Sequence, residues 1–183
     1  MEESSIIEHT KNWLRDVVIG CNFCPFAGRE FKRETIRYTV VQHSDREKIL
    51  QTLALELERL NNYPAIETTL IIIPENFEDF YSYLDLVSLS EMLIEREGYE
   101  GIYQVASFHP NYLFAGSSEN DASNYTNRSP YPMLHLLREE SISKALESYS
   151  HPEAIPERNI EFANRKGLQY MQALRQACLR ALE

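Results

Sequence analysis

The sequence has few cysteines, and it has none of the long apolar segments that form membrane-spanning helices. Its three cysteines, Cys21, Cys24 and Cys178, are an odd and small number, so we expect reduced thiols and no disulfide framework. The start of the chain, MEESSIIEHT, carries acidic residues where a signal peptide has lysine or arginine. These absences predict a cytoplasmic protein that does not enter a membrane.

Positive charge is also scarce. The chain has 18 lysines and arginines against 28 aspartates and glutamates, which gives a formal net charge of −10. This excess repels nucleic acids and anionic membranes unless basic residues gather in a patch, and the sequence shows no such patch. We therefore expect neither as a partner. A chain of 183 residues with 43% hydrophobic residues suits a single domain over residues 1–183.

The first part of the chain alternates between helical and strand patterns. Apolar residues at helical spacing predict helices over 5–20, 44–60 and 75–97, and strands are expected at 35–42, 68–74 and 101–108. Ser44-x-x-Glu47 has the capping-box pattern that begins a helix. Because each helix must cross back over a face of the sheet, this order predicts a layered α/β domain. Its sheet is expected to be small and mainly parallel, with three to four strands covered by helices.

A long connection without regular pattern follows His109. Connections of about twenty residues are long for a compact domain and are typically functional or disordered, and the aromatic residues of this one argue against disorder. A helix is then predicted from Pro132 to Tyr149, and a last helical pattern runs from Ile160 to Cys178.

The segment before the predicted Pro132 helix carries more polar groups than a helix cap needs. Arg128 would lie near the positive end of the helix dipole, where its charge is disfavoured unless an anion lies between them. This predicts a site for a small anionic ligand. The residues expected to bind it are Asn124, Asn127, Arg128 and Ser129. The alternative is that Arg128 pairs with Glu119 or Asp121 and only holds the loop.

Three residues are candidates for catalysis. His135 would lie in the first turn of the predicted helix, where the dipole lowers a histidine pKa, and His109 lies at the carboxyl end of a strand, where ligands of parallel sheets gather. Cys24 could act as a nucleophile, with either histidine as base or orienting group and an asparagine as donor to developing negative charge. In the structural alternative, His109 bonds a backbone carbonyl and Cys24 is a small buried apolar residue.

Metal binding and pure binding are further alternatives. Cys21 and Cys24 form a Cys-x-x-Cys pair, which is only half a zinc site and follows a helix, unlike redox pairs. A metal-dependent hydrolase or oxygen-using enzyme would combine His109 and His135 with Cys24 or Asp121. A non-catalytic module would use the loop as a partner surface. The leading hypothesis is an enzyme acting on a small anionic metabolite.

Three segments, NFCPFA, ASFHPNYLFAG and NYTNRSPYPMLHLLRE, resemble the bacterial and plastid family known as the domain of unknown function number 1415. The resemblance extends over nearly the whole chain. It implies no activity, cofactor or catalytic residue. The family usually has an aliphatic residue at the position of Cys21, which further weakens the zinc interpretation. The positions that match the family are Cys24, His109, Asn124, Asn127, Arg128, Ser129 and His135, which predicts a site built from separated segments.

Overall fold

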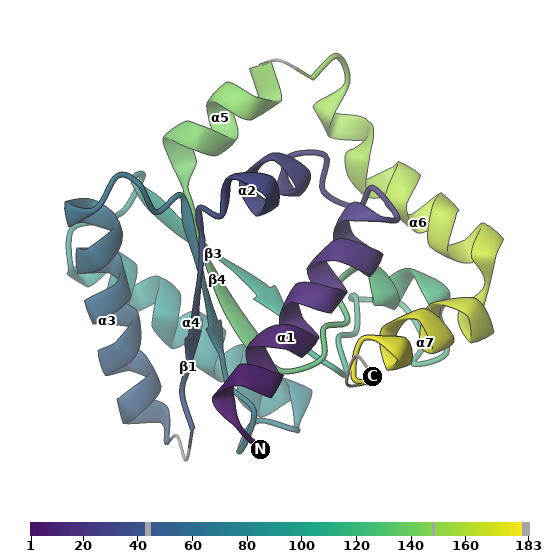
Figure 1. Cartoon of the computed structure of the whole chain (residues 1–183), viewed down its shortest axis with the longest axis horizontal. Coiled ribbons are helices and arrows are strands. Elements are labelled where there is room, and N and C mark those ends of the chain that lie inside the picture. The colour runs from purple at the N-terminus through teal and green to yellow at the C-terminus, as the bar shows by residue number, and fades with distance from the viewer. Residues whose placement is uncertain (43–44, 148, 181–183) are drawn as a thin grey trace.

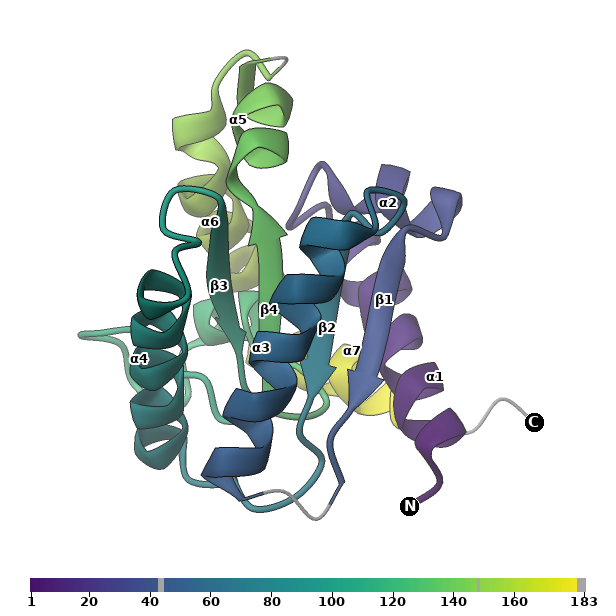
Figure 2. The ribbon, with the colours of Figure 1, turned by 90° about the vertical axis from the view of Figure 1, so that its left-hand side faces the viewer.

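A four-stranded sheet in the order β1-β2-β4-β3 divides the molecule into three layers. Helices α3 and α4 cover one face, and α1, α6 and α7 lie on the other (Figures 1 and 2). The structure is a computed structural model that describes residues 1–42, 45–147 and 149–180. The prediction of a layered α/β protein is confirmed.

Helices and strands alternate along the first half of the chain, and helices dominate its end. The α-helices are α1 Glu3–Trp13, α2 Ala27–Arg33, α3 Arg46–Asn62, α4 Phe80–Arg96, α5 Glu139–Glu147, α6 Ile155–Lys166 and α7 Leu168–Ala177. The strands are β1 Ile36–Val40, β2 Thr68–Ile72, β3 Tyr103–Phe108 and β4 Met133–Arg138. Three short helical segments complete the set: the π-helix η1 Leu14–Ile19 and the 3-10 helices η2 Ala122–Thr126 and η3 Pro152–Ala154.

The prediction of a mainly parallel sheet is wrong. Only β1 and β2 pair in parallel within the described sheet, and β4 pairs antiparallel with β2 on one side and β3 on the other. The order strand, helix, strand, helix, strand does make β1, β2 and β3 run in one direction, as expected. The fourth strand, β4, then enters the sheet between β2 and β3. The sequence pattern does not predict this strand.

The expected helix from Pro132 to Tyr149 is therefore also wrong at its start. Residues Met133–Arg138 form β4, and the helix begins only at Glu139. The segment misleads because leucine and methionine favour helices and because it contains no β-branched residue. Both faces of β4 are covered, so the strand also lacks the polar alternation that identifies a half-exposed strand.

Helix ends differ from the expected pattern in three places. Ser44 lies outside the described residues, and the side chain of Asp45 caps α3 by accepting a hydrogen bond from the amide of Lys48 at 2.8 Å. The first helix begins at Glu3, before Ser5. The expected C-terminal helix is divided into α6 and α7 at Gly167, whose φ of 83° suits glycine.

Two apolar cores lie on opposite faces of the sheet. Trp13, Leu70, Ile72 and Met133 belong to the core under α1, α6 and α7. Alternate residues of the same strands, among them Ile71 and Leu134, face α3 and α4. Alternation along β4 therefore directs Leu134 and Leu136 to one face and Met133 and His135 to the other.

Candidate functional site

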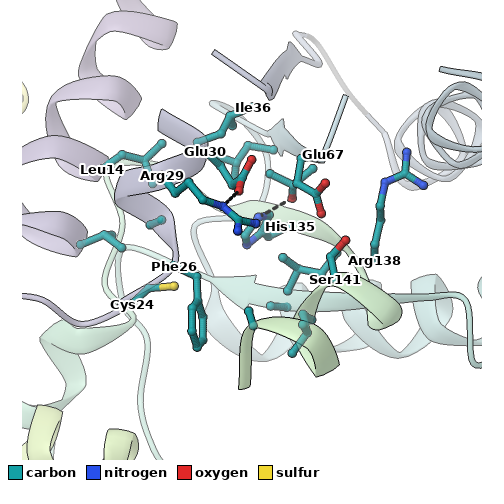
Figure 3. Close-up of a pocket in the computed structure, with 18 of the residues that line it drawn as sticks. Leu14, Cys24, Phe26, Arg29, Glu30, Ile36, Glu67, His135, Arg138 and Ser141 are labelled. Carbon is teal, nitrogen blue, oxygen red and sulfur yellow. Dashed lines mark hydrogen bonds and ion pairs between the residues drawn. The ribbon is translucent and has the colours of Figure 1, made fainter. Parts of the chain in front are cut away.

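A pocket of about 340 Å³ opens at the end of the sheet where β1, β2 and β3 begin. Side chains of all four strands line it, together with η1, the start of α2 and one face of α5 (Figure 3). Most of its surface is apolar. Its polar, charged and reactive side chains are Trp13, Cys24, Arg29, Glu30, Glu67, Thr68, Gln104, His135, Arg138 and Ser141. Two residues that the sequence suggested for catalysis, Cys24 and His135, thus line one pocket.

His135 lies within β4 and pairs with Leu70 of β2 and Ala106 of β3. Its Nε2 lies 2.7 Å from the hydroxyl oxygen of Thr68, and that hydroxyl donates to the carbonyl oxygen of Leu136 at 2.5 Å. The single hydroxyl proton serves Leu136, so Nε2 must carry a proton and donate it to Thr68. The ring is therefore held in the tautomer that leaves a lone pair on Nδ1.

The environment keeps His135 neutral. Burial lowers the pKa of His135 to about 4. Among the described residues, none forms a hydrogen bond with Nδ1. A ring with this low pKa is a weak base, but its Nδ1 lone pair is a good hydrogen-bond acceptor. The geometry suits His135 to orient a ligand better than to remove a proton from it.

Cys24 reaches the pocket from the turn between η1 and α2. Its amide donates to the carbonyl of Val18 at 3.5 Å, and its own carbonyl accepts from the amide of Ala27 at 3.4 Å. The thiol of Cys24 is partly exposed, whereas Cys21 and Cys178 are buried. Burial raises the pKa of Cys21 and raises the pKa of Cys178 to about 11. Cys24 is therefore the thiol most open to a molecule in the pocket.

The indole N–H of Trp13 is a buried hydrogen-bond donor without an acceptor in the described part of the chain. It is the single tryptophan of the chain, it lines the pocket from the end of α1, and its side chain is only 1% exposed. Its indole Nε1 has no hydrogen-bond partner among the described residues. Such an unsatisfied buried donor costs about 1–3 kcal/mol. The indole nitrogen is itself enclosed, so a ligand in the pocket would accept from it only after neighbouring side chains shift.

The charged side chains that line the pocket are balanced in number, with Glu30 and Glu67 against Arg29 and Arg138. Glu30 accepts hydrogen bonds from Thr35 Oγ1 at 2.7 Å and from Arg29 Nε at 2.5 Å. Burial acts to raise the pKa of Glu30, but these two bonds and the charge of Arg29 lower the pKa below its ordinary value. Glu67 also lines the pocket (Figure 3). Arg29 is thus committed to Glu30, and Arg138 turns its guanidinium away from the pocket (Figure 3).

A family model described as "Protein of unknown function (DUF1415)" matches residues 5–173, which is nearly the whole chain. The chain belongs to this family. The match confirms the resemblance carried by the three sequence segments. No curated protein matches the chain, and no solved structure does.

In this DUF1415 protein, His109 is part of the scaffold and not of the pocket. It is fully buried at the carboxyl end of β3. Its Nε2 lies 2.7 Å from the carbonyl oxygen of Phe77, and its Nδ1 accepts from the amide of Asn111 at 2.9 Å. Burial lowers the pKa of His109, which keeps the ring neutral. Both nitrogens hold the start of the long loop against the segment before α4.

The predicted ligand-binding residues lie in the loop after His109, at the opposite end of the sheet from the pocket. Asn124 makes three side-chain hydrogen bonds within the loop, to residues 114, 117 and 118. Ser129 donates to the carbonyl of Tyr131 at 2.5 Å, and Asn127 accepts from Thr126 at 3.0 Å. These side chains are brought together with each other, but not with Cys24 or His135.

Arg128 is held by the same loop. Its Nε donates to the carbonyl of Tyr112 at 3.0 Å, and its Nη2 donates to the carbonyl of Glu119 at 3.1 Å. The partners are backbone oxygens and not the carboxylates of Glu119 or Asp121 that the alternative interpretation required. In the described chain no helix begins at Pro132, so the dipole that suggested an anion beside Arg128 is absent. Anion binding by Arg128 stays a prediction.

The described residues contain no group of three or more His, Cys, Asp or Glu side chains placed to hold a metal ion. His109 has both ring nitrogens occupied by backbone groups. The metal-binding alternative therefore stays a prediction without an assembled set of ligands. In the same part of the chain, no helix has the length and apolar character needed to cross a bilayer.

Three groups of the pocket were not found from the sequence. In the sequence, Trp13 and Thr68 only fit the patterns of a helix and a strand, and Glu67 precedes that strand without belonging to any motif. Trp13 is distinctive in the sequence only as the single tryptophan, and this does not predict whether its N–H has a hydrogen-bond partner. The contact between Thr68 and His135 depends on β4 lying beside β2, and so it follows only from the strand order.

Proposed function

We propose that this protein is an enzyme that binds a small uncharged molecule in the pocket between the sheet, α2 and α5, and that Cys24 and His135 act on it. The observation that carries the proposal is the contact of His135 Nε2 with a Thr68 hydroxyl that donates to Leu136, while Nδ1 has no partner among the described residues. We infer from it an unused acceptor inside a mainly apolar pocket. Pockets of a few hundred cubic ångströms with few, well-placed polar groups are typical of ligand sites.

Recognition would rest on one donor and one acceptor. The indole N–H of Trp13 has no acceptor among the described residues, and Nδ1 of His135 has no donor among them. A molecule with an apolar body and an amide-like head, having both a carbonyl oxygen and an N–H, matches this pair. The apolar wall from η1 and α5 would contact the body of the ligand.

Chemistry is assigned to the thiol. The Cys24 thiol gives its proton to water, and the thiolate sulfur forms a bond to the carbonyl carbon while the π electron pair moves to the carbonyl oxygen, where the Trp13 N–H would stabilise it. When this pair returns, the C–N bond breaks and the amine leaves with a proton taken from water. A water molecule then hydrolyses the thioester, which releases the acid and restores the thiol. His135 orients the ligand by accepting a hydrogen bond from the N–H of the ligand. A pKa near 4 makes this orienting role more suitable for His135 than that of general base.

Charge supports an uncharged ligand in this pocket. The two guanidinium groups of the lining are already engaged: Arg29 pairs with Glu30, and Arg138 donates to the carbonyls of Leu60 and Ile66. Neither is therefore open to an anionic ligand. The small anionic metabolite suggested by the sequence depended on Arg128, whose side chain does not line this pocket.

Benzamide is a suitable probe because it combines an apolar ring with a carbonyl oxygen and an N–H. We expect it to bind with a dissociation constant on the order of millimolar, as fragments of this size do. The single tryptophan gives one indole N–H signal in proton–nitrogen NMR spectra. Benzamide should shift this signal in a saturable manner, whereas benzoate, the matched anion, should shift it less.

Matched variants separate pocket binding from general effects. Ala106→Leu fills the pocket from β3 and should abolish the shift, while Ala177→Leu adds the same atoms on the exposed end of α7 and should not. His135→Gln retains a donor for Thr68 and should weaken benzamide binding. The proposal would be contradicted if benzamide did not shift the indole signal, or if it shifted the signal as much in Ala106→Leu as in the parent protein.

Labelling with iodoacetamide tests the role of Cys24 as nucleophile. At neutral pH we expect Cys24 to react faster than a free model thiol, and Cys21 and Cys178 to react slowly because they are buried. Peptide mapping by mass spectrometry gives the three rates. If Cys24 reacts no faster than the model thiol while benzamide still binds, the pocket belongs to a non-catalytic binding module.

A further inference from the structure

We propose that Arg128 and Arg175 form a second site, which binds a phosphate-type oxyanion beside Tyr125, at the end of the sheet where β3 finishes. This site goes beyond the function proposed for the Cys24 pocket. The hollow that Arg175 and Tyr125 line shares none of its described residues with that pocket.

The guanidinium of Arg128 is fixed in place before any ligand arrives. Two backbone carbonyls of the long loop accept from its Nε and Nη2. The guanidinium also lies over the ring of Tyr125, with 4.7 Å between the guanidinium carbon and the ring centre. Nη1 has no hydrogen bond to another described residue. An arginine held in this way loses little side-chain entropy when it binds an anion.

Arg175 reaches the same segment from α7. Its Nε donates to the carbonyl of Ser129, the residue next to Arg128, at 2.9 Å. This single contact leaves both terminal nitrogens of Arg175 without a hydrogen bond to another described residue. Tyr125 lies between the two arginines: the guanidinium of Arg128 lies over its ring, and Arg175 lines a hollow with it. Arg128 is outside the lining of that hollow, but its charge acts on Arg175. Two guanidinium groups from distant parts of the chain are therefore held around one tyrosine.

The two positive charges lack a carboxylate partner. Several arginines of the described chain have a carboxylate oxygen within 4.0 Å, namely Arg15, Arg29, Arg37 and Arg59. Within that same part of the chain, neither Arg128 nor Arg175 has one, although acidic residues outnumber basic residues in the sequence. Burial lowers the pKa of Arg175; Tyr125 acts against this effect, and the charge of Arg128 adds a smaller lowering. The two guanidinium groups repel each other, and an anion bound between them would reduce this repulsion.

The surroundings supply neutral donors. The hollow measures about 470 Å³, and its other side chains include the amides of Gln169, Gln172 and Gln176. Guanidinium groups bind phosphate oxygens through two parallel N–H bonds, and neutral amides can serve the oxygens that remain. The described residues that line this hollow include no carboxylate. A phosphate group fits these donors in charge and in number of acceptor oxygens.

Inorganic phosphate is the probe for this site. We expect phosphate to raise the melting temperature of the parent protein more than chloride at equal ionic strength. Arg128→Gln and Arg175→Gln should each lower the phosphate affinity by about tenfold, since each removes a positively charged hydrogen-bond donor. Arg165→Gln removes the same charge from the exposed surface of α6 and should keep the parent affinity.

The parent protein alone can overturn the proposal. Equal melting temperatures in phosphate and chloride would do so, whether or not the arginine variants fold. A loss of phosphate affinity in Arg165→Gln as large as that in Arg175→Gln would also overturn it. Such a result would show that phosphate responds only to the overall charge of the protein. Phosphate should leave the Trp13 indole signal unchanged, so this test and the benzamide test fail independently.

Discussion

The two histidines of the sheet use the same ring in different ways. Both ring nitrogens of His109 form hydrogen bonds with backbone groups, Nε2 with Phe77 and Nδ1 with Asn111. The ring thereby ties the start of the long loop to the segment before α4. His135 spends only Nε2, on Thr68, and keeps Nδ1 for the pocket. The difference lies in the neighbours, since the ring of His135 faces a cavity whereas that of His109 is enclosed on all sides. Availability of a lone pair, more than residue type, separates a site residue from a scaffold residue.

The lowered pKa of His135 makes a prediction about stability. The unfolded ring binds a proton near pH 6.5 and the folded ring only near pH 4, so the unfolded state holds more protons between these values. Stability from His135 is therefore complete above about pH 6.5 and declines as the pH falls toward 4. Between pH 7.5 and 5, the parent should lose about 2 kcal/mol more unfolding free energy than His135→Gln, measured with urea.

His151→Gln is the control for this titration, because His151 is exposed. It should keep the pH dependence of the parent. His109 adds a decline of the same sign in all three proteins, since burial lowers its pKa as well, and it cancels in the comparison. A histidine NMR signal of the folded protein that titrates near pH 6.5 and is missing in His135→Gln would show the pKa assignment to be wrong.

At the scale of elements, β4 decides both the sheet and the site. The sequence predicts the other three strands and the helices between them, because their apolar residues recur with the period of each element. It fails at Met133–Arg138, where local preference favours a helix. The strand forms there because β2 and β3 offer two open edges, and pairing with both satisfies its backbone groups. Tertiary pairing of this kind leaves no local signal.

Arg138 fastens the end of β4. Its Nη2 donates to the carbonyls of Leu60 at 2.6 Å and Ile66 at 2.9 Å, and its Nη1 donates to the hydroxyl of Tyr103 at 3.1 Å. We expect Arg138→Met to lower the unfolding free energy by about 2–4 kcal/mol, because it leaves several partly buried oxygens without a donor. Arg96→Met, on the exposed end of α4, should change stability by less than about 0.5 kcal/mol. Equal losses in the two variants, measured by urea unfolding, would argue against this role.

At the scale of the whole molecule, the residues singled out from the sequence divide between two ends of the sheet. Cys24 and His135 meet in one pocket, while His109 and the polar loop residues gather at the other end. Motif residues could be named from the sequence because unusual residue types stand out. Their distribution over two places could not, since it depends on the direction of β4, which carries His135 away from the loop that precedes it.

The strand order also has a consequence for synthesis on the ribosome. β3 is complete at Phe108, but its one neighbour in the described sheet is β4, which begins at Met133. While the intervening segment is being translated, the nascent chain carries an apolar strand whose edge has nothing to pair with, although β1 and β2 can already join. A truncated mRNA that ends between the codons for β3 and β4 would thus give an aggregation-prone fragment and not a smaller functional domain.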